Sequence, residues 1–476
     1  MNLADALAPR LAAHPGLSGI HSLLDPHEAF AARMRFARIA ERTLDVQYYI
    51  WRADMTGVLL FRELHQAAER GVRVRLLLDD NNTVGLDAML TALDLHPNIE
   101  VRLFNPSRFR RFRLLNIVTN FSRANRRMHN KSMTVDNAAT LIGGRNVGDE
   151  YFGAGHGPLF TDLDVAAIGP AVQAVSDDFE RYWSCECAVR LAEVVAPGDS
   201  EQLERLLERA QTTEQRAEAR QYVEAVHQTA FMTDLIEDTL VLDWAPTQLV
   251  SDDPRKGIGK AAARDLVLVR LGDLLGEPKR VIDLVSAYFV PAKDGTARLV
   301  ALAQAGVQIR ILTNSLDATD VAAVHAGYAK RRRALLKAGV RLFELRRVAP
   351  RRRGRKNKLK SGPLGSSSSS LHAKTFAVDE DFMFVGSFNF DPRSARLNTE
   401  LGFLIDSRKM AGDIDRLFDD RVPELAYEVV LGRHGRMNWI EQVDGRTVRH
   451  PYEPDAAWFR RASVVVLSFL PIEWLL

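Results

Sequence analysis

Cysteine is scarce in this chain, with only Cys185 and Cys187 among 476 residues. One Cys-x-Cys pair without a nearby histidine set is a poor framework for a zinc site or for disulfide bonds. Long apolar runs are also missing, since no stretch reaches the roughly 18 residues of a membrane-spanning helix. The start, MNLADALAPR, lacks the basic and apolar regions of a signal peptide. We therefore expect neither disulfides nor membrane-spanning helices, and the few cysteines are compatible with a reducing compartment.

Acidic residues are absent from two strongly basic stretches, although the formal net charge is only +3. Between Val101 and Val135 there are nine Lys or Arg residues, interleaved with Phe109, Phe112 and Phe121. This composition predicts a surface for phosphates, of either anionic lipid or nucleic acid. A second stretch within residues 346–370 has nine Lys or Arg residues followed by SGPLGSSSSS. We interpret it as a flexible, solvated basic insert with no assigned role.

A histidine motif occurs twice in the chain. In RMHNKSMTVDNAATLIGGRN, a lysine follows the histidine by two positions, an aspartate by seven and an asparagine by seventeen. LHAKTFAVDEDFMFVGSFN repeats the same spacing. The residues concerned are His129, Lys131, Asp136 and Asn146 in the first copy, and His372, Lys374, Asp379 and Asn389 in the second. The duplication makes a functional interpretation far stronger than one copy would.

Both copies suit phosphoryl chemistry. Side chains two apart on an extended chain share a face, so each histidine and lysine can meet one ligand. One histidine can attack phosphorus while the second protonates the leaving alkoxide, and the lysines and asparagines can stabilise the charge, so no metal is required. Each imidazole also needs an acceptor at its other nitrogen, for which we predict Asp162 in FTDLDV and Glu400 in NTELGF. The two motif aspartates lie inside apolar runs and resemble buried supporting acceptors.

The two halves also repeat each other outside the motifs. LDVQYYIW is followed by a helical pattern with Leu60, Leu64 and Ala67 on one face, and then by VRVRLLLDD. In the second half, VIDLVSAYFV, GTARLVALAQA and VQIRILTNS follow in the same order. A strand, helix and strand in succession favour parallel strands with helices on the sheet.

These repeats predict an N-terminal domain over residues 1–188, a helical bridging segment over 189–245 and a C-terminal domain over 246–476. The bridging segment contains SEQLERLLERA, for which Ser200 is the expected N-cap. Two copies of one motif predict a pseudo-twofold arrangement with a single composite site. The last residues, WFRRASVVVLSFLPIEWLL, form an apolar tail after paired arginines, either at a membrane interface or packed on the core.

The repeated His-x-Lys-x4-Asp pattern resembles the HKD signature of the phospholipase D superfamily. The segments NRRMHNKS, GGRN, AVHAGYA, GSFNFDPRS and LNTELGF further resemble bacterial cardiolipin synthases of the C type, over nearly the whole chain. The resemblance implies an α/β fold of two fused phospholipase D-like domains, each a mixed sheet flanked by helices. It also implies a catalytic set comprising His129, Lys131, Asp136, His372, Lys374 and Asp379, with no cofactor.

The implied activity is transfer of a phosphatidyl group, through a phosphatidyl-histidine, onto the glycerol hydroxyl of phosphatidylglycerol. Phosphatidylglycerol is the expected substrate, and phosphatidylethanolamine is a second candidate. The enzyme would be peripheral, at an anionic membrane surface on the cytoplasmic face of the bacterial inner membrane. Nucleic acid is not an expected partner, and whether a protein partner exists is left open by the sequence. The alternative is a phosphodiester hydrolase or nuclease of the same superfamily, which the basic aromatic stretch would also suit.

Overall fold

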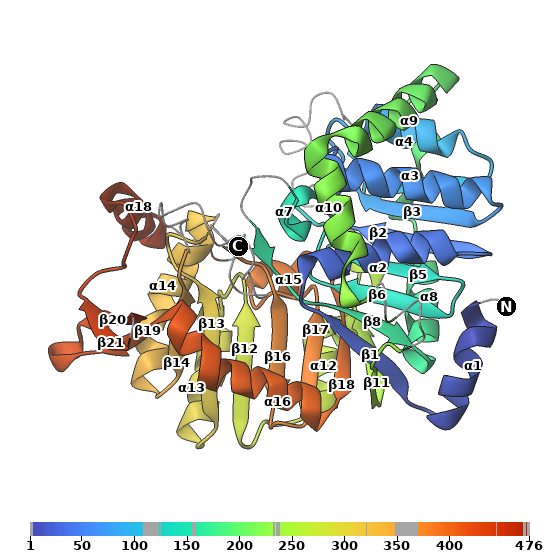
Figure 1. Ribbon diagram of the computed structural model, residues 1–476. Helices are drawn as coiled ribbons and strands as arrows, with labels where there is room; N and C mark the ends of the chain where they lie inside the picture. Colours follow the sequence, from blue (N-terminus) through green and yellow to red (C-terminus); the bar gives the residue numbers. More distant parts are fainter. Residues whose placement is uncertain are drawn as a thin grey trace. The chain divides into compact units, whose positions relative to one another are not determined.

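The computed structural model describes residues 3–107, 123, 125–154, 159–231, 234, 239–319, 321–347, 370–443, 445–469 and 473. Contacts divide the chain into two compact units (Figure 1). Unit 1 comprises residues 1–157, 163–267 and 397–403, and unit 2 comprises residues 158–162, 268–396 and 404–476. Each unit therefore includes one short segment from the other half of the sequence. The domain boundaries expected from the sequence stay a prediction.

A mixed sheet of nine strands, counted over the described residues, forms unit 1. In spatial order the strands are β10 (Asp243–Ala245), β1 (Ser18–Leu23), β8 (Asp164–Ile168), β6 (Ala139–Gly143), β5 (Ser132–Val135), β2 (Thr43–Tyr48), β3 (Arg73–Asp79), β4 (Ile99–Phe104) and β9 (Ala188–Arg190). The β2–β3 and β3–β4 pairs are parallel, and the other pairs are antiparallel. Strands β5, β6 and β8 are buried along their whole length, so both faces of the sheet are covered there.

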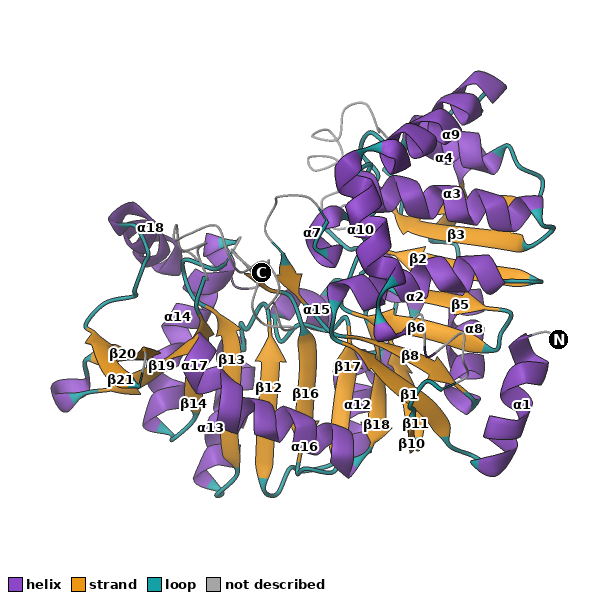
Figure 2. Ribbon diagram, in the orientation of Figure 1, coloured by secondary structure: helices purple, strands orange, loops and turns teal. Residues whose placement is uncertain are grey.

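Helices of unit 1 supply this cover (Figure 2). They are α1 (Leu3–Ala13), α2 (Pro26–Ile39), α3 (Met55–Glu69), α4 (Asp87–Asp94), α7 (Asp149–Phe152), α8 (Pro170–Trp183), α9 (Ser200–Gln215) and α10 (Ala217–His227). As predicted, Leu60, Leu64 and Ala67 lie on the buried face of α3. Helices α9 and α10 pack on α3 and α2. Asp199, rather than Ser200, caps α9, because its carboxylate accepts the Gln202 backbone N–H at 2.8 Å.

Unit 2 is built on a second mixed sheet. Its strands, in spatial order, are β18 (Leu401–Asp406), β17 (Phe382–Gly386), β16 (Lys374–Val378), β12 (Val281–Ser286), β13 (Gln308–Asn314), β14 (Arg341–Leu345), β19 (Ala426–Leu431), β20 (Met437–Val443) and β21 (Arg446–His450). The first three residues of β18 belong to unit 1, as does β11 (Thr247–Ser251), to which β18 is hydrogen-bonded. The pairs β12–β13 and β13–β14 are parallel. A separate two-stranded parallel sheet joins β15 (Ser370–Leu371) to β7 (Phe160–Thr161).

The helices of unit 2 follow the same plan. They are α12 (Val267–Leu275), α13 (Ala292–Gln304), α14 (Ala322–Lys337), α15 (Pro392–Arg396), α16 (Arg408–Arg416), α17 (Val422–Leu425) and α18 (Trp458–Phe469). Helix α16 packs on β16 and β17, and α14 packs on β14 and β19.

The order β6-β5-β2-β3-β4 in unit 1 corresponds to β17-β16-β12-β13-β14 in unit 2. The predicted internal repeat is therefore confirmed, and so is an α/β fold of mixed sheets flanked by helices.

Candidate active site

His129 of unit 1 lies just before β5, beside a segment from the second half of the sequence. Its backbone N–H donates to the Thr399 carbonyl at 2.9 Å, and the Thr399 N–H donates to the Arg127 carbonyl at 2.9 Å. These bonds hold residues 397–403 in unit 1, next to the first motif. The next residue of that segment is Glu400, one of the two acceptors predicted from the sequence.

The Glu400 carboxylate is completely buried and contacts the imidazole of His129, with Oε2 2.8 Å from Nδ1. A carboxylate at Nδ1 favours the tautomer that has its lone pair on Nε2, and it stabilises the ring when it becomes charged. The backbone of Glu400 is itself fixed, because its N–H donates to Asp252 Oδ2 at 2.8 Å. Burial raises the pKa of Asp252 to about 6, despite the nearby Lys256 ammonium. The geometry is that of a nucleophile or proton carrier with a fixed orientation.

Lys131 lies two residues after His129, directly before β5. Its side chain is 1% exposed, and Nζ donates to the His129 carbonyl oxygen. The ammonium also lies 5.4 Å from the centroid of the Tyr49 ring, which in turn meets the His129 ring edge-on at 4.8 Å. Tyr49 was missed as a site residue, although it lies in the LDVQYYIW segment, because nothing in the sequence placed its ring against the motif.

His372 of unit 2 has the corresponding environment. Its N–H donates to the Thr161 carbonyl at 2.8 Å, and its Nδ1 lies 2.5 Å from Asp162 Oδ2. Asp162 comes from residues 158–162, the segment of the first half that belongs to unit 2. Lys374 repeats the contact of Lys131 with the carbonyl oxygen of the motif histidine, and its Nζ also lies 2.7 Å from His372 Nδ1.

The pairing of histidines and acids is crossed. Glu400 follows the second motif but contacts the first histidine, and Asp162 follows the first motif but contacts the second histidine. The partners are 271 and 210 residues apart in sequence. Alignment of the repeats identified these acids as acceptors but did not indicate which ring each contacts.

The two motif asparagines differ in their surroundings. The Asn146 side chain is fully buried, accepts the Ile50 N–H at 3.1 Å and donates to the Tyr151 hydroxyl at 3.0 Å. The side-chain oxygen of Asn389 is also buried, but it has no hydrogen-bond partner among the residues that the structure describes. Phosphate binding by both residues stays a prediction.

Asp136 and Asp379 are not brought to the histidines. Each follows the far end of its strand, β5 or β16, seven residues from the histidine, and extended chain covers roughly 20 Å over that length. The Asp136 carboxylate accepts backbone N–H groups of residues 41–43 at 2.7–3.0 Å, and Asp379 accepts those of residues 279–281. Asp379 is only partly buried, whereas a buried residue was expected. Both aspartates therefore tie a strand turn to the start of a neighbouring strand.

Comparison with known proteins gives the family. The family model described as "Cardiolipin synthase, PLD-like domain" matches residues 35–183 and 271–422. The chain is 50% identical over 474 residues to cardiolipin synthase C of Escherichia coli (strain K12), covering 100% of this chain and 99% of that protein. The chain belongs to this family.

More distant relatives agree with this assignment. Cardiolipin synthase A of Pseudomonas entomophila (strain L48) is 24% identical over 424 residues, covering 88% of this chain and 70% of that protein. The crystal structure of phosphatidylserine synthase from Haemophilus influenzae Rd KW20 matches the whole chain with a TM-score of 0.59 at 13% identity, which shows the fold. The resemblance stated from the sequence, including two phospholipase D-like domains, is confirmed.

Among the described residues, the histidine motifs are not part of any group of three or more His, Cys, Asp or Glu side chains close enough to share a metal ion. A group with such spacing, His325, Glu344 and Glu453, lies elsewhere in unit 2. The Arg332 guanidinium already lies among these side chains, 3.2 Å from Glu344 Oε1 and 3.1 Å from His325 Nε2. A cation in that position makes the group an ion-pair network rather than a metal site.

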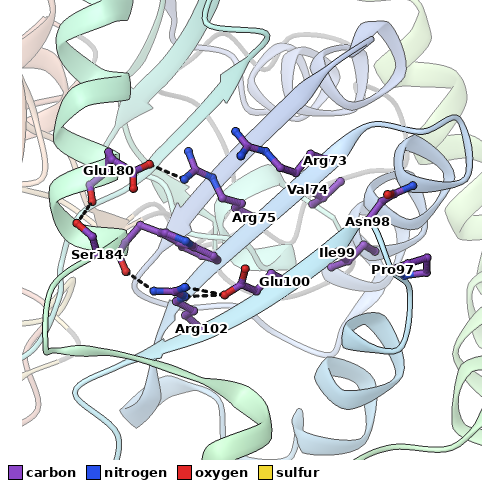
Figure 3. Close-up of a pocket in the computed structure, with 11 residues that line it drawn as sticks. Arg73, Val74, Arg75, Pro97, Asn98, Ile99, Glu100, Arg102, Glu180 and Ser184 are labelled. Carbon is purple, nitrogen blue, oxygen red and sulfur yellow. Dashed lines mark hydrogen bonds and ion pairs between the residues drawn. The ribbon is translucent and has the colours of Figure 1, made fainter.

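Unit 1 also has a hollow of about 460 Å³, shown in Figure 3. Its lining does not include the motif residues. Two of its arginines are neutralised, because Arg75 pairs with Asp45 and Glu180, and Arg102 pairs with Glu100. It is therefore a poor phosphate site. None of the described helices has the length and apolar character needed to cross a bilayer.

Proposed function

We propose that this chain is a phosphatidyltransferase of the phospholipase D type that makes cardiolipin from phosphatidylglycerol. The observation that carries the proposal is a histidine with a buried carboxylate at Nδ1 and a lysine beside it, occurring once in each unit. The 50% identity to cardiolipin synthase C of Escherichia coli supports it.

In the proposed first step, the Nε2 lone pair of His129 forms a bond to the donor's phosphorus while the bond to the leaving alkoxide breaks. His372 gives that oxygen a proton. In the second step, His372 takes the proton from the glycerol hydroxyl of a second phosphatidylglycerol. The new P–O bond then forms as the P–N bond of the phosphatidyl-histidine breaks.

His129 is assigned as the nucleophile by the resemblance to the family, because the two motifs are too similar in their contacts to decide the roles. Rapid quenching with labelled lipid should trap phosphohistidine at position 129, and label at position 372 would reverse the roles.

Charge stabilisation is assigned to Lys131, Lys374, Asn146 and Asn389. Removing one such donor costs on the order of 3 kcal/mol of transition-state stabilisation. Because cationic side chains supply this role, we propose that turnover needs no metal or other cofactor. Activity should survive chelation with EDTA, and its restoration by a divalent cation would contradict the lysine-based account.

Transfer must compete with hydrolysis of the phosphatidyl-histidine. Water is present at roughly 55 M, whereas a bound, oriented acceptor reaches an effective molarity of about 10⁵ M or more. An acceptor pocket is therefore required. The stretch proposed for its wall, Arg108 to Arg127, lies mostly outside the described residues, including Phe109, Phe112 and Phe121.

The proposal is tested by supplying phosphatidylglycerol, with and without phosphatidylethanolamine, and identifying the products by mass. Cardiolipin as the main product is expected. Phosphatidic acid under every acceptor condition would make the enzyme a phospholipase. Cleavage of DNA or RNA without lipid turnover would favour the nuclease alternative, which the family assignment makes the weaker candidate.

We also propose that the enzyme is peripheral and works at an anionic membrane surface, on the cytoplasmic face of the bacterial inner membrane. Exposed apolar residues on α18 support a membrane contact, since Trp458 is 75% exposed and Phe459 is 57% exposed. The same helix contacts α14, and Val464 is buried. Over residues 458–469, α18 thus has one face packed on α14 and one exposed apolar face, and we propose that the exposed face meets the membrane.

A further inference from the structure

A cavity of about 760 Å³ lies in unit 2, among α14, the start of β20, residues 451–453 and α18. Its lining includes none of the proposed catalytic or phosphate-binding residues. The volume is within the usual range of small-molecule sites. Figure 1 labels the elements that form it, with α14 and α18 in contact.

Three guanidinium groups on the lining have no carboxylate partner among the described residues: Arg333, Arg436 and Arg461. Arg333 donates to the Gly435 carbonyl at 2.7 Å, and Arg461 lies 5.8 Å from the centroid of the Tyr452 ring. Arg436 is exposed and directly precedes β20. All three line the same cavity, so their positive charges lie around one space.

The acid on the lining, Glu453, does not cancel this charge. Its carboxylate contacts Arg332 and lies 2.9 Å from His325 Nε2. Burial alone would raise the pKa of Glu453, but the Arg332 charge and the His325 hydrogen bond hold it at about 2. Glu453 therefore belongs to the buried ion-pair network behind the cavity, where Arg332 also binds Glu344.

One wall of the cavity is apolar and leads to the exposed face of α18. Met437, Trp439 and Val464 line the cavity, and Val465 lines it while remaining 56% exposed. Farther along the helix, Val466 is 64% exposed. Arginine next to apolar and aromatic surface is the composition of segments that lie at a bilayer interface.

We propose that this cavity binds the headgroup phosphate of an anionic phospholipid from the bilayer surface, with the acyl chains along the apolar wall. Guanidinium groups suit a phosphodiester because they donate paired hydrogen bonds and stay charged. The bound lipid is not turned over, because no nucleophile of the two motifs lies there. The inference rests on the proposed function only for the presence of a lipid bilayer.

The hollow of unit 1 in Figure 3 supplies the contrast. Arg75 and Arg102 in that hollow already have carboxylate partners, and Arg73 is exposed with none among the residues that the structure describes. Arg73 together with Arg408, which is 88% exposed and pairs with the partly exposed Asp381, provides a control with the same change of net charge. Surface charges more than about 10 Å from a bound lipid are largely screened in physiological salt.

The test measures binding of the 476-residue chain to two kinds of vesicle. One kind contains phosphatidylcholine alone, and the other contains about one third phosphatidylglycerol in phosphatidylcholine. His129→Gln is included throughout to stop turnover. Arg436→Gln with Arg461→Gln should weaken binding to the anionic vesicles about fivefold for each arginine, and leave binding to phosphatidylcholine unchanged. Arg73→Gln with Arg408→Gln should leave both unchanged. Neither Arg436→Gln nor Arg461→Gln removes a partner from a buried ion pair, so this cavity variant should fold. Thermal unfolding of the cavity variant and of the control variant checks this.

Equal binding of the cavity variant and its parent to anionic vesicles would overturn the proposal, as would equal losses in the cavity variant and the control. Displacement from the vesicles by inorganic phosphate, at concentrations where chloride of equal ionic strength has no effect, would mean an ion site instead. Turnover is measured separately, with His129 intact and phosphatidylglycerol in detergent micelles. The variant with both cavity arginines exchanged should then retain the parent's kcat. If the parent itself formed no cardiolipin, that result would count against the proposed function alone.

Discussion

At the scale of single residues, the crossed carboxylates are the most testable feature. Glu400→Gln keeps the shape at His129 Nδ1 but removes the charge that favours the reactive tautomer and stabilises the charged ring. We expect kcat to fall on the order of 10³-fold to 10⁴-fold, as for the equivalent change in a serine protease triad. Asp162→Asn should act in the same way on His372. Steady-state cardiolipin formation across pH measures both.

A purely structural role for Glu400 would give a different pattern. Glu400→Asp retains the charge and should recover part of the activity, with a pH profile like that of the wild type. If the Gln and Asp variants lost equal activity with unchanged pH profiles, Glu400 would not act through the imidazole.

The motif aspartates give a contrasting prediction, because their contacts are to backbone rather than to a ring. Asp136→Asn should lower the free energy of unfolding by about 2 kcal/mol, through weaker bonds to three partly buried backbone N–H groups. The folded variant should retain kcat within a few-fold. Urea unfolding and turnover check this, with exposed Asp177→Asn as the control. A large loss of kcat without loss of stability would restore a catalytic role to Asp136.

Sequence reasoning worked at this scale where spacing alone decides geometry. The strand period of two placed Lys131 beside His129, and duplication identified the acids Asp162 and Glu400. It could not reveal that the acids exchange partners, because that depends on pairing between segments more than 200 residues apart. Tyr49 was missed because its ring contact with His129 also joins segments that are distant in sequence.

At the scale of elements, α18 combines a packed face with an exposed apolar face. Trp458→Ser with Phe459→Ser should weaken vesicle binding on the order of tenfold, because two aromatic rings no longer enter the interface. Thermal unfolding should be unchanged, since both side chains are exposed. Val84→Ser with Val241→Ser, at positions 70% and 75% exposed in unit 1, is the matched control. Unaltered binding of the aromatic variant would assign α18 to a role away from the membrane.

The buried Glu453–Arg332 pair that joins residues 451–453 to α14 predicts a pH dependence. Glu453 has a pKa of about 2 in the folded protein against an ordinary value of 4.5. A depressed pKa gives stability that is present above pH 4.5 and lost as pH falls toward 2. Glu453→Gln should therefore cost about 3 kcal/mol at neutral pH, and its difference from wild type should shrink below pH 4.5.

Urea unfolding at several pH values measures this difference. Glu428→Gln breaks a more exposed pair with Arg341 and should cost no more than about 1 kcal/mol at any pH. A Glu453 effect that did not depend on pH would show that the loss comes from packing.

The long elements were predictable because their patterns are local. The strand–helix–strand repeats appear as β2, α3 and β3, and as β12, α13 and β13. The two-residue strands β7 and β15 have no local signature, and each exists only because the other pairs with it. The basic insert within 346–370 lies outside the described residues apart from its first two positions and its last.

At the scale of the whole molecule, the exchanged segments make the halves of the chain interdependent. A fragment of residues 1–267 lacks Glu400, and a fragment of residues 268–476 lacks Asp162. We expect neither fragment alone to form cardiolipin, and co-expression of the two to restore turnover. Activity of either fragment by itself would show that its histidine does not need the acid from the other half.

The same exchange sets an order of events during synthesis on the ribosome. His129 leaves the exit tunnel long before Glu400, because 271 residues separate them. A polypeptide that terminates anywhere before residue 400 therefore carries a first motif without its carboxylate. We therefore expect incomplete products of translation to leave lipids unattacked.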